Sequence, residues 1–192
     1  MALHVALIQP QIPPNTGNIA RLCVATDTPL HLIEPLGFSI TDADVRRAGL
    51  DYWDRLDLWV HPDWFAFRDA MNRSRCLYFS AKATQSYINA PYRSNSCLVF
   101  GSETEGMPLR ILEKHPEQCF TIPMTGSVRS LNLANAVSIV LYEAIRQQTN
   151  GRVQPVKNPH PEQSEGSAPS AEMRADGEDP SEAVPPQDEE TV

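Results

Sequence analysis

The sequence lacks the features that define several common protein classes. No apolar run approaches the roughly 20 residues that a bilayer-spanning helix needs, and no basic leader precedes the first apolar run at Leu3. The patterns GxGxxG and GxxxxGK[ST] are both missing, which removes the main support for dinucleotide or nucleoside-triphosphate binding. We therefore expect a soluble, cytoplasmic protein without a membrane segment.

Cysteine is scarce and has no metal-binding pattern. The four cysteines, Cys23, Cys76, Cys97 and Cys119, are far apart, with no CxxC pair and no histidine at zinc-ligand spacing. Disulfides are uncommon in a reducing cytosol, and structural zinc sites need closely spaced ligands. We expect four free, buried thiols and no metal.

The last 38 residues, 155–192, have no aromatic residue and few branched aliphatic ones, and they are rich in Pro, Glu, Ser and Asp. Such a segment cannot bury enough apolar surface to offset its ordering entropy, so we predict a disordered tail. Its ten acidic residues against Lys157 and Arg174 account for the whole net charge of -8. Residues 1–154 are therefore neutral, and their charge neither indicates nor excludes a nucleic acid.

Short, mostly continuous apolar runs alternate with helical patterns along residues 1–154. Runs of this kind, bounded by turn formers, are typical of parallel strands covered on both faces. The sequence predicts one α/β domain over 1–154, with a mostly parallel sheet flanked by helices. Strands are expected at 3–9, 29–34, 77–81, 97–102 and 119–124, with a weaker one at 56–61, and helices at about 15–26, 63–73, 108–114 and 131–148.

All three informative loops lie where a predicted strand ends and a helix begins, the edge at which open α/β sheets bind ligands. In IPPNTGNIARLC (12–23), Pro13 and Pro14 precede a helix that Asn15 or Thr16 can cap, and its N–H groups could bind an anion. An ordinary capped helix explains that loop equally well. In LVFGSETEGMPL (98–109), a tight glycine turn at 101 lets a ligand approach closely, although such turns are common.

The third loop leads into the last predicted helix. It is polar over 125–130, and Asn132 and Asn135 follow three residues apart. The helix beyond them is apolar on almost every face, which requires burial on several sides. One side can lie on the sheet, so we expect the other to contact a second protomer.

Together the three stretches NTGNIARLC, LVFGSETEGMP and IPMTGSVRSLNLANAVSIVLYEAIRQ resemble the signature motifs of the SPOUT class of RNA methyltransferases, in its TrmH-like branch. The resemblance covers about residues 3–150 and is greatest to the small enzymes that methylate the ribose of the tRNA wobble nucleotide. It implies a sheet with a C-terminal trefoil knot, a rare exception to unthreaded chains. It also implies a homodimer and S-adenosyl-L-methionine as the methyl donor.

The resemblance also assigns roles to individual residues. It implies 2′-O-methylation of cytidine or uridine 34 in tRNA, by alignment of the ribose hydroxyl with the sulfonium methyl. Alternatives that remain open are another tRNA or rRNA position, or a non-catalytic RNA-binding protein of the same fold. The implied residues are Arg21, Asn18 and Ser130 for catalysis, Phe79, Gly101, Ile122, Ser130 and Leu131 for the cofactor, and Arg129 and Tyr142 for RNA, with interface packing an equal alternative for Tyr142. Arg46 and Arg47, adjacent on a predicted short helical segment, are candidates for RNA phosphate contact because few other basic residues are available, with a solvated surface as the alternative.

Three positions depart from the family pattern. Ser102 replaces a usual proline, Val128 replaces the first serine of a Ser-Arg-Ser triplet, and Glu105 stands where a basic residue is frequent. The first two should leave main-chain contacts intact. Glu105 changes the charge that RNA would meet at this loop.

Overall fold

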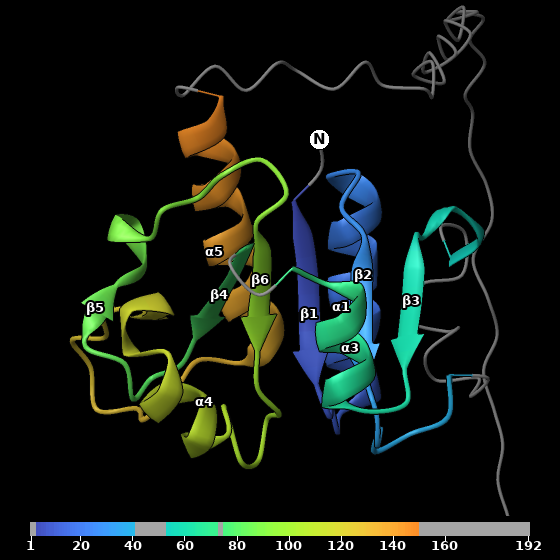
Figure 1. Cartoon of the computed structure of the whole chain (residues 1–192), viewed down its shortest axis with the longest axis horizontal. Coiled ribbons are helices and arrows are strands. Elements are labelled where there is room, and N and C mark those ends of the chain that lie inside the picture. The colour runs from blue at the N-terminus through green and yellow to red at the C-terminus, as the bar shows by residue number, and fades with distance from the viewer. Residues whose placement is uncertain (1–2, 41–52, 73–74, 150–192) are drawn as a thin grey trace, which may run out of the picture. The chain divides into compact units, whose positions relative to one another are not determined.

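The computed structural model describes residues 3–40, 53–72 and 75–149 (Figure 1). Arg46, Arg47 and the expected tail lie outside the described residues, as does the expected domain boundary at 154. None of the described helices combines the length and the apolar character that a bilayer crossing needs.

The core of the fold is a parallel sheet of seven strands, in the order β3-β2-β1-β6-β4-β7-β5. All six expected strands are confirmed. The seventh, β5, has two residues and no apolar pattern that sequence reasoning could detect. The strands are β1 (His4–Ile8), β2 (Leu30–Ile33), β3 (Leu58–His61), β4 (Cys76–Phe79), β5 (Gln85–Ser86), β6 (Cys97–Phe100) and β7 (Cys119–Thr121).

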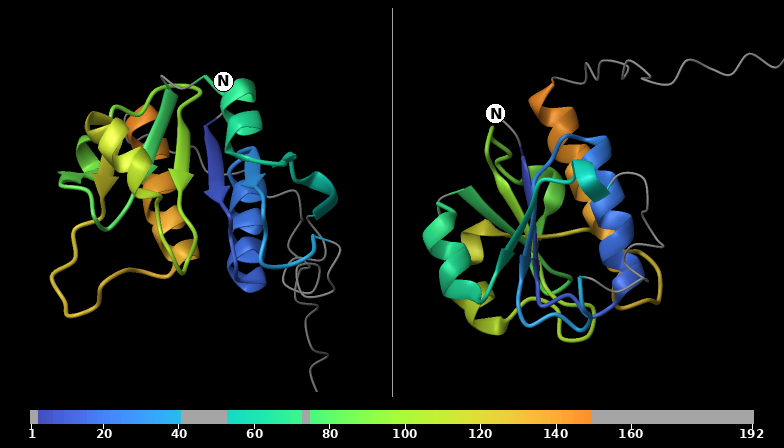
Figure 2. Two further views of the ribbon diagram at one scale, coloured as in Figure 1. Left: turned by 60° about the horizontal axis from the view of Figure 1, so that its bottom comes forward. Right: turned by 90° about the vertical axis from the view of Figure 1, so that its right-hand side faces the viewer.

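Helices cover both faces of the sheet, as the continuous apolar strands predict. Among the described residues the α-helices are α1 (Pro13–Ala25), α3 (Trp64–Ala70), α4 (Leu109–Lys114) and α5 (Leu133–Gln148). Figure 2 shows α1 and α5 side by side on one face, and α3 and α4 on the other. Short 3-10 turns lie at Trp53–Arg55, Tyr87–Asn89 and Pro116–Gln118.

The alternation of side chains along each strand divides the core into two layers. Val5 and Leu98 pack with Val140 of α5, whereas Ala6 and Val99 pack with Phe67 of α3. All four cysteines are buried and unpaired, which confirms the expectation for them. Three of them, Cys76, Cys97 and Cys119, belong to the layer under α3 and α4.

Helix α1 begins earlier than expected, and the prediction that Asn15 or Thr16 caps it is wrong. The N-cap is Ile12, which makes no side-chain capping bond, and Pro13 occupies the first helical position. Proline suits this position because its fixed φ is helical and its missing N–H would have no partner there. Asn15 and Thr16 are consequently buried inside the first turn.

Between β1 and β6 the order in which the chain adds strands to the sheet changes direction, although the strands remain parallel. From β1 the chain builds outward through β2 and β3, and then returns to build β4, β6 and β7 on the other side. Loops that leave neighbouring strands in opposite directions open a crevice at the carboxyl edge of such a sheet. This edge is where a ligand site is expected, and it is where the three motif loops lie.

Candidate active site

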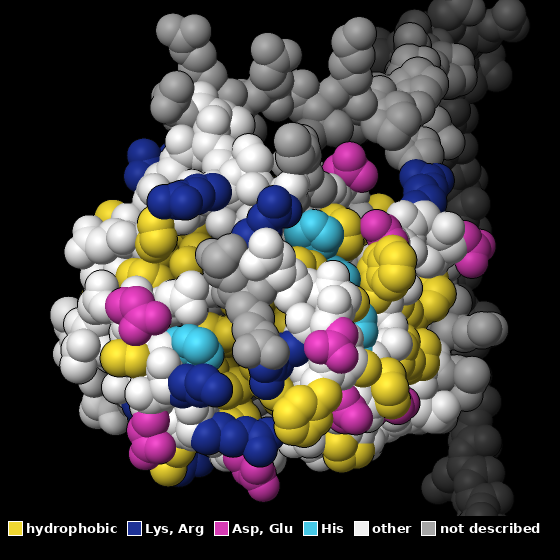
Figure 3. Space-filling model, in the orientation of Figure 1, with side chains coloured by type: hydrophobic (Ala, Val, Ile, Leu, Met, Phe, Trp, Pro, Cys, Tyr) yellow, Lys and Arg dark blue, Asp and Glu magenta, His cyan; other side chains and the backbone are white. Residues whose placement is uncertain are grey.

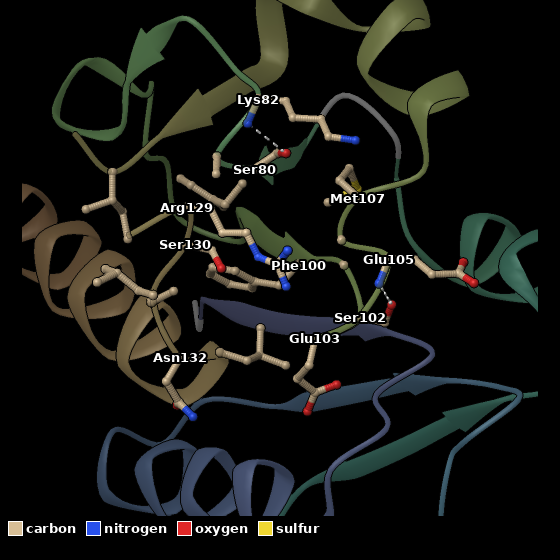
Figure 4. Close-up of a pocket in the computed structure, with 18 of the residues that line it drawn as sticks. Ser80, Lys82, Phe100, Ser102, Glu103, Glu105, Met107, Arg129, Ser130 and Asn132 are labelled. Carbon is tan, nitrogen blue, oxygen red and sulfur yellow. Dashed lines mark hydrogen bonds between the residues drawn. The ribbon is translucent and has the colours of Figure 1, made fainter. Parts of the chain in front are cut away.

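A cavity of about 680 Å³ opens at the carboxyl edge of the sheet, beyond the ends of β4, β6 and β7 (Figure 4). Its walls come from the loop after β4, the loop after β6 and the segment that joins β7 to α5. The start of α1 contributes Asn15, and the residue just before that helix, Ile12, also lines the cavity. All three motif stretches therefore meet at one cavity, although they are far apart in the sequence.

All five residues predicted to bind the cofactor line this cavity: Phe79, Gly101, Ile122, Ser130 and Leu131. Phe79 is buried at the end of β4, where its ring stacks on Phe100 with 5.2 Å between centroids. The cavity floor is thus aromatic and fixed by the core. Ser130 is exposed and lines the cavity.

The loop after β6 folds tightly back on Gly101. Ser102 and Gly106 form an antiparallel bridge, in which the Gly106 N–H donates to the Ser102 carbonyl over 2.9 Å. Gly106 has a φ of 71°, a value that favours glycine. A β-carbon on Gly101 would overlap the backbone of Gly106 and Met107, so only glycine fits there.

The segment from 123 to 131 provides main-chain groups rather than regular structure. It forms neither helix nor strand, and makes no backbone–backbone hydrogen bond with any other described residue. Main-chain N–H and C=O groups need partners when a ligand removes them from water. Those that border the cavity are available to a ligand that presents both donors and acceptors.

A chain of hydrogen bonds joins the three motif loops through side chains. The Glu103 carboxylate accepts from the Gln11 N–H at 2.8 Å, the Ile12 N–H at 3.3 Å and the Asn15 amide at 3.0 Å. The Asn15 oxygen accepts from the amide of Asn132 at 2.9 Å. One carboxylate therefore ties the first and second motif loops together, and Asn15 extends the connection to the third.

Asn132 also begins helix α5. Its side-chain oxygen accepts from the N–H groups of Ala134 at 2.9 Å and Asn135 at 3.4 Å, which is an N-cap. The same amide thus holds the helix start and, through Asn15, the loop network. This dual use accounts for a polar side chain where an otherwise apolar helix begins.

The charged side chains that line the cavity balance in sign. Lys82 and Arg129 contribute two cations, and Glu103 and Glu105 contribute two anions. Figure 4 shows the Arg129 guanidinium extending over Phe100, while the Glu105 carboxylate points outward. The cavity suits a ligand with groups of both signs better than one with several like charges.

The other predicted catalytic residues do not line the cavity. Asn18 and Arg21 lie three residues apart on one exposed face of α1. Tyr142, on α5, is 52% exposed. A single chain therefore brings the five predicted cofactor residues, which include Ser130, and Arg129 to one cavity. It leaves Asn18 and Arg21 outside that cavity.

Sequence reasoning missed two contributors to the site, Asn15 as a connecting residue and Lys82 as a lining cation. Lys82 follows the end of β4, so its place after a buried strand was a usable signal. The role of Asn15 depends on Glu103, 88 residues away in the sequence, and no local pattern reveals it.

Three histidine side chains form a second polar group, on the face of the sheet that α3 covers. His4 Nδ1 lies 3.0 Å from His31 Nε2, and His31 Nδ1 lies 3.0 Å from His61 Nε2. Burial, followed by the neighbouring imidazoles, lowers the pKa of His31 to about 3. Within the described ranges no group of three or more His, Cys, Asp or Glu side chains could hold a metal ion. The three imidazoles form a neutral structural chain.

Comparison with known proteins gives a consistent family. The model of the SpoU rRNA Methylase family matches residues 2–142. A tRNA (cytidine(34)-2'-O)-methyltransferase of Escherichia coli K12 is 47% identical over 146 residues, which are 76% of this chain and 93% of the relative. A relative of the same name from Burkholderia cenocepacia is 46% identical over 147 residues, 75% of this chain and 94% of its own.

Solved structures agree with this result. One, from work on the 2-OH methylation of C/U34 on tRNA, has 47% identity and a TM-score of 0.74, and the match covers 78% of this chain and 97% of that one. The SpoU methyltransferase AviRb of Streptomyces viridochromogenes, solved in complex with AdoMet, has 25% identity and a TM-score of 0.69, with 79% of this chain and 59% of its own covered. The chain belongs to the SpoU rRNA methylase family.

Proposed function

We propose that this protein transfers the methyl group of S-adenosyl-L-methionine to the ribose 2′-hydroxyl of the wobble nucleotide, cytidine or uridine 34, in tRNA. The observation that carries the proposal is the convergence of all five predicted cofactor residues on one cavity. The names of the E. coli and B. cenocepacia relatives, at 46 to 47% identity, support the choice of nucleotide. Such a reaction on tRNA belongs in the cytoplasm.

The cavity fits the methyl donor in shape and chemistry. The aromatic floor at Phe79 and the apolar side chains of Ile122 and Leu131 suit the faces of an adenine ring, and the main chain of 123–131 suits its edge. Two anions and two cations suit the amino and carboxylate groups of the methionine part. When bound, the donor supplies a sulfonium methyl that needs little activation, so the protein mainly aligns the reacting atoms.

A trefoil knot is part of the proposal. Strand β7 pairs with β4 and β5. Helix α5, in contrast, packs beside α1 on one face of the sheet, over β1 and β6. The segment 122–132 must therefore return across the ends of β4 and β6, where it meets the tight loop at 101–107 along the cavity. We assign the threading of the chain to this return, and we assign cofactor binding to the same crossing.

The proposed active site is completed by a homodimer. Ile139 and Tyr142 on α5 are 37% and 52% exposed, while the rest of that helix contributes Val137, Val140 and Leu141 to the core. A partly exposed apolar face on an otherwise buried helix suits a protein partner. Pairing through this face, beside α1, would bring the partner's Asn18 and Arg21 toward the cavity.

In the assembled site, Arg21 binds the phosphate or the developing oxyanion of the substrate. Guanidinium groups keep their proton in proteins, so this side chain acts through charge and its planar fork rather than as a base. Ser130 and Asn18 position the ribose hydroxyl through hydrogen bonds. Arg129 and Tyr142 contact the RNA, and Arg46 and Arg47, beyond the described residues, are proposed to contact its phosphates.

The test is methyl transfer to unmodified tRNA, with mass-spectrometric mapping of ribose methylation. We expect one 2′-O-methyl group, at nucleotide 34, and loss of transfer in Arg21→Lys with the affinity for S-adenosylmethionine preserved. A methyl group at another position would establish the alternative substrate. Cofactor binding without transfer to any RNA would establish a non-catalytic protein, and near-normal turnover of Arg21→Lys would exclude the planar-fork role.

A further inference from the structure

A second cavity, of about 250 Å³, adjoins the cofactor cavity on the far side of the 101–107 loop. The two cavities share five lining residues: Lys82, Ser102, Glu105, Gly106 and Met107. Any molecule in the second cavity therefore lies directly beside the proposed cofactor cavity. The function proposed above does not use this space.

The lining of the second cavity has an apolar part and a polar part. Ile8, Met107, Pro108 and Leu109 form the apolar part, while Gln9, Ser102 and Lys82 contribute an amide, a hydroxyl and an ammonium group. Within the described part of the chain, the Gln9 amide and the Lys82 ammonium make no hydrogen bond or ion pair. Figure 4 shows the Lys82 side chain extending toward Met107, and both residues line both cavities.

Helix α4 extends the positive charge away from this cavity. Its first residue, Leu109, lines the cavity and is 57% exposed. Arg110 and Lys114, four residues apart, are exposed on the same side of the helix. Neither forms an ion pair with a described residue, and Figure 3 shows Lys and Arg side chains gathered over α4.

We infer that the second cavity and the outer side of α4 form a binding site for the RNA strand beside the methylated nucleotide. An unpaired base can place its faces against the apolar lining and its edge toward Gln9 and Ser102, as in recognition of single-stranded loops. Lys82, Arg110 and Lys114 then contact successive phosphates. This inference rests on the proposed function, because it takes the substrate to be an RNA loop.

The residue at position 105 affects the charge that RNA would meet at this site. The resemblance leads us to expect a basic residue there, but this chain has Glu105, which lines both cavities. The cations near that position come instead from Lys82 and from α4. Glu105 and Glu113 reduce the local positive potential without pairing with Arg110 or Lys114.

The first experiment measures binding of an anticodon stem-loop RNA directly, from 50 to 200 mM salt, without the cofactor. In the variant Arg110→Ala/Lys114→Ala we expect weaker binding, and a slope of log K against log salt that falls by about two, one for each lost phosphate contact. The matched control is Arg55→Ala/Arg75→Ala. It removes two exposed cations just before β3 and β4, at the opposite edge of the sheet, and should leave the slope unchanged.

The second experiment uses single variants in the cavity with the same RNA. Lys82→Ala should weaken binding, and Glu105→Gln should tighten it roughly two- to fivefold at low salt, a gain that misfolding cannot produce. Equal slopes for the α4 variant and its control, or unchanged affinity in both cavity variants, would overturn the inference. Binding is measured apart from methyl transfer, so the site can be confirmed even if the wild-type protein methylates no tRNA.

Discussion

Replacement of Glu103 by glutamine tests whether one carboxylate holds the active-site loops together. The carboxylate has only acceptors, and three N–H groups donate to it, from Gln11, Ile12 and the Asn15 side chain. A glutamine of the same shape must turn its NH₂ toward at least one of these donors. If the amide faces Gln11, one bond is lost, and if it faces Ile12 and Asn15, two are lost.

The expected loss of stability follows from this count. A hydrogen bond to a charged group contributes about 1.5 to 3 kcal/mol, and the bond to Ile12 is exposed and long at 3.3 Å, so it contributes less. With the Gln11 N–H left facing a donor, the free energy of unfolding should fall by about 2 kcal/mol. For a domain of this size that corresponds to a decrease in Tm of roughly 4 to 8 °C.

The assay combines thermal unfolding with calorimetric titration of S-adenosylmethionine. Because Asn15 links Glu103 to Asn132 at the cavity, we expect Glu103→Gln to weaken cofactor affinity several-fold even well below its Tm. The control is Glu105→Gln, two residues away, whose carboxylate is exposed and should change stability by less than about 0.5 kcal/mol. If both variants unfold at the same temperature, the carboxylate does not hold the loops together.

Three further predictions follow from the same structure. Gly101→Ala should reduce S-adenosylmethionine affinity more than tenfold in calorimetry, because its methyl overlaps the Gly106 backbone, whereas Gly126→Ala, with open space around it, should not. Asn132→Ala should lower the free energy of unfolding by about 1 to 2 kcal/mol and remove the helix cap. Asn132→Asp should keep the cap but lose the bond to Asn15, because its carboxylate cannot donate, and should weaken cofactor affinity. The pKa of His31 is about 3 in the folded protein and 6.5 in the unfolded chain, so the free energy of unfolding should fall below pH 6.5 by up to about 1.4 kcal/mol per pH unit. Urea unfolding of His31→Gln between about pH 6.5 and 4.5 should show a shallower fall in that free energy than the wild type, and an equal fall would refute this.

The sequence was sufficient to predict the layers and strands because burial dictates their composition. Continuous apolar runs such as 97–100, bounded by turn formers, are typical of strands covered on both faces, and the sheet is parallel as expected. The cavity residues were predicted from the resemblance rather than from composition. This agrees with the cavity itself, which is bordered by a tight glycine turn and by main-chain groups that make no backbone hydrogen bond with described residues.

What the sequence did not reveal depends on contacts between distant residues. Asn15 is of a residue type that often caps helices, and local propensity favours that role. The two prolines move the helix start forward to Pro13, so Asn15 becomes buried and pairs with Glu103. Strand β5 was missed for the opposite reason, because Gln85 and Ser86 pair with β7 through the main chain and carry no apolar signal.

The position of Glu103 also bears on where RNA can bind. The N–H groups at the start of α1 were one possible anion site, but the Glu103 carboxylate already accepts from those of Gln11 and Ile12, just before the helix. A phosphate placed there would have to displace a carboxylate that three donors hold, and would leave the Asn15 NH₂ group without its acceptor. On the proposed function, RNA phosphates at this edge would then be bound by side-chain cations: from the loop after β4, from α4, from Arg129 and, in the proposed dimer, from the partner's Arg21.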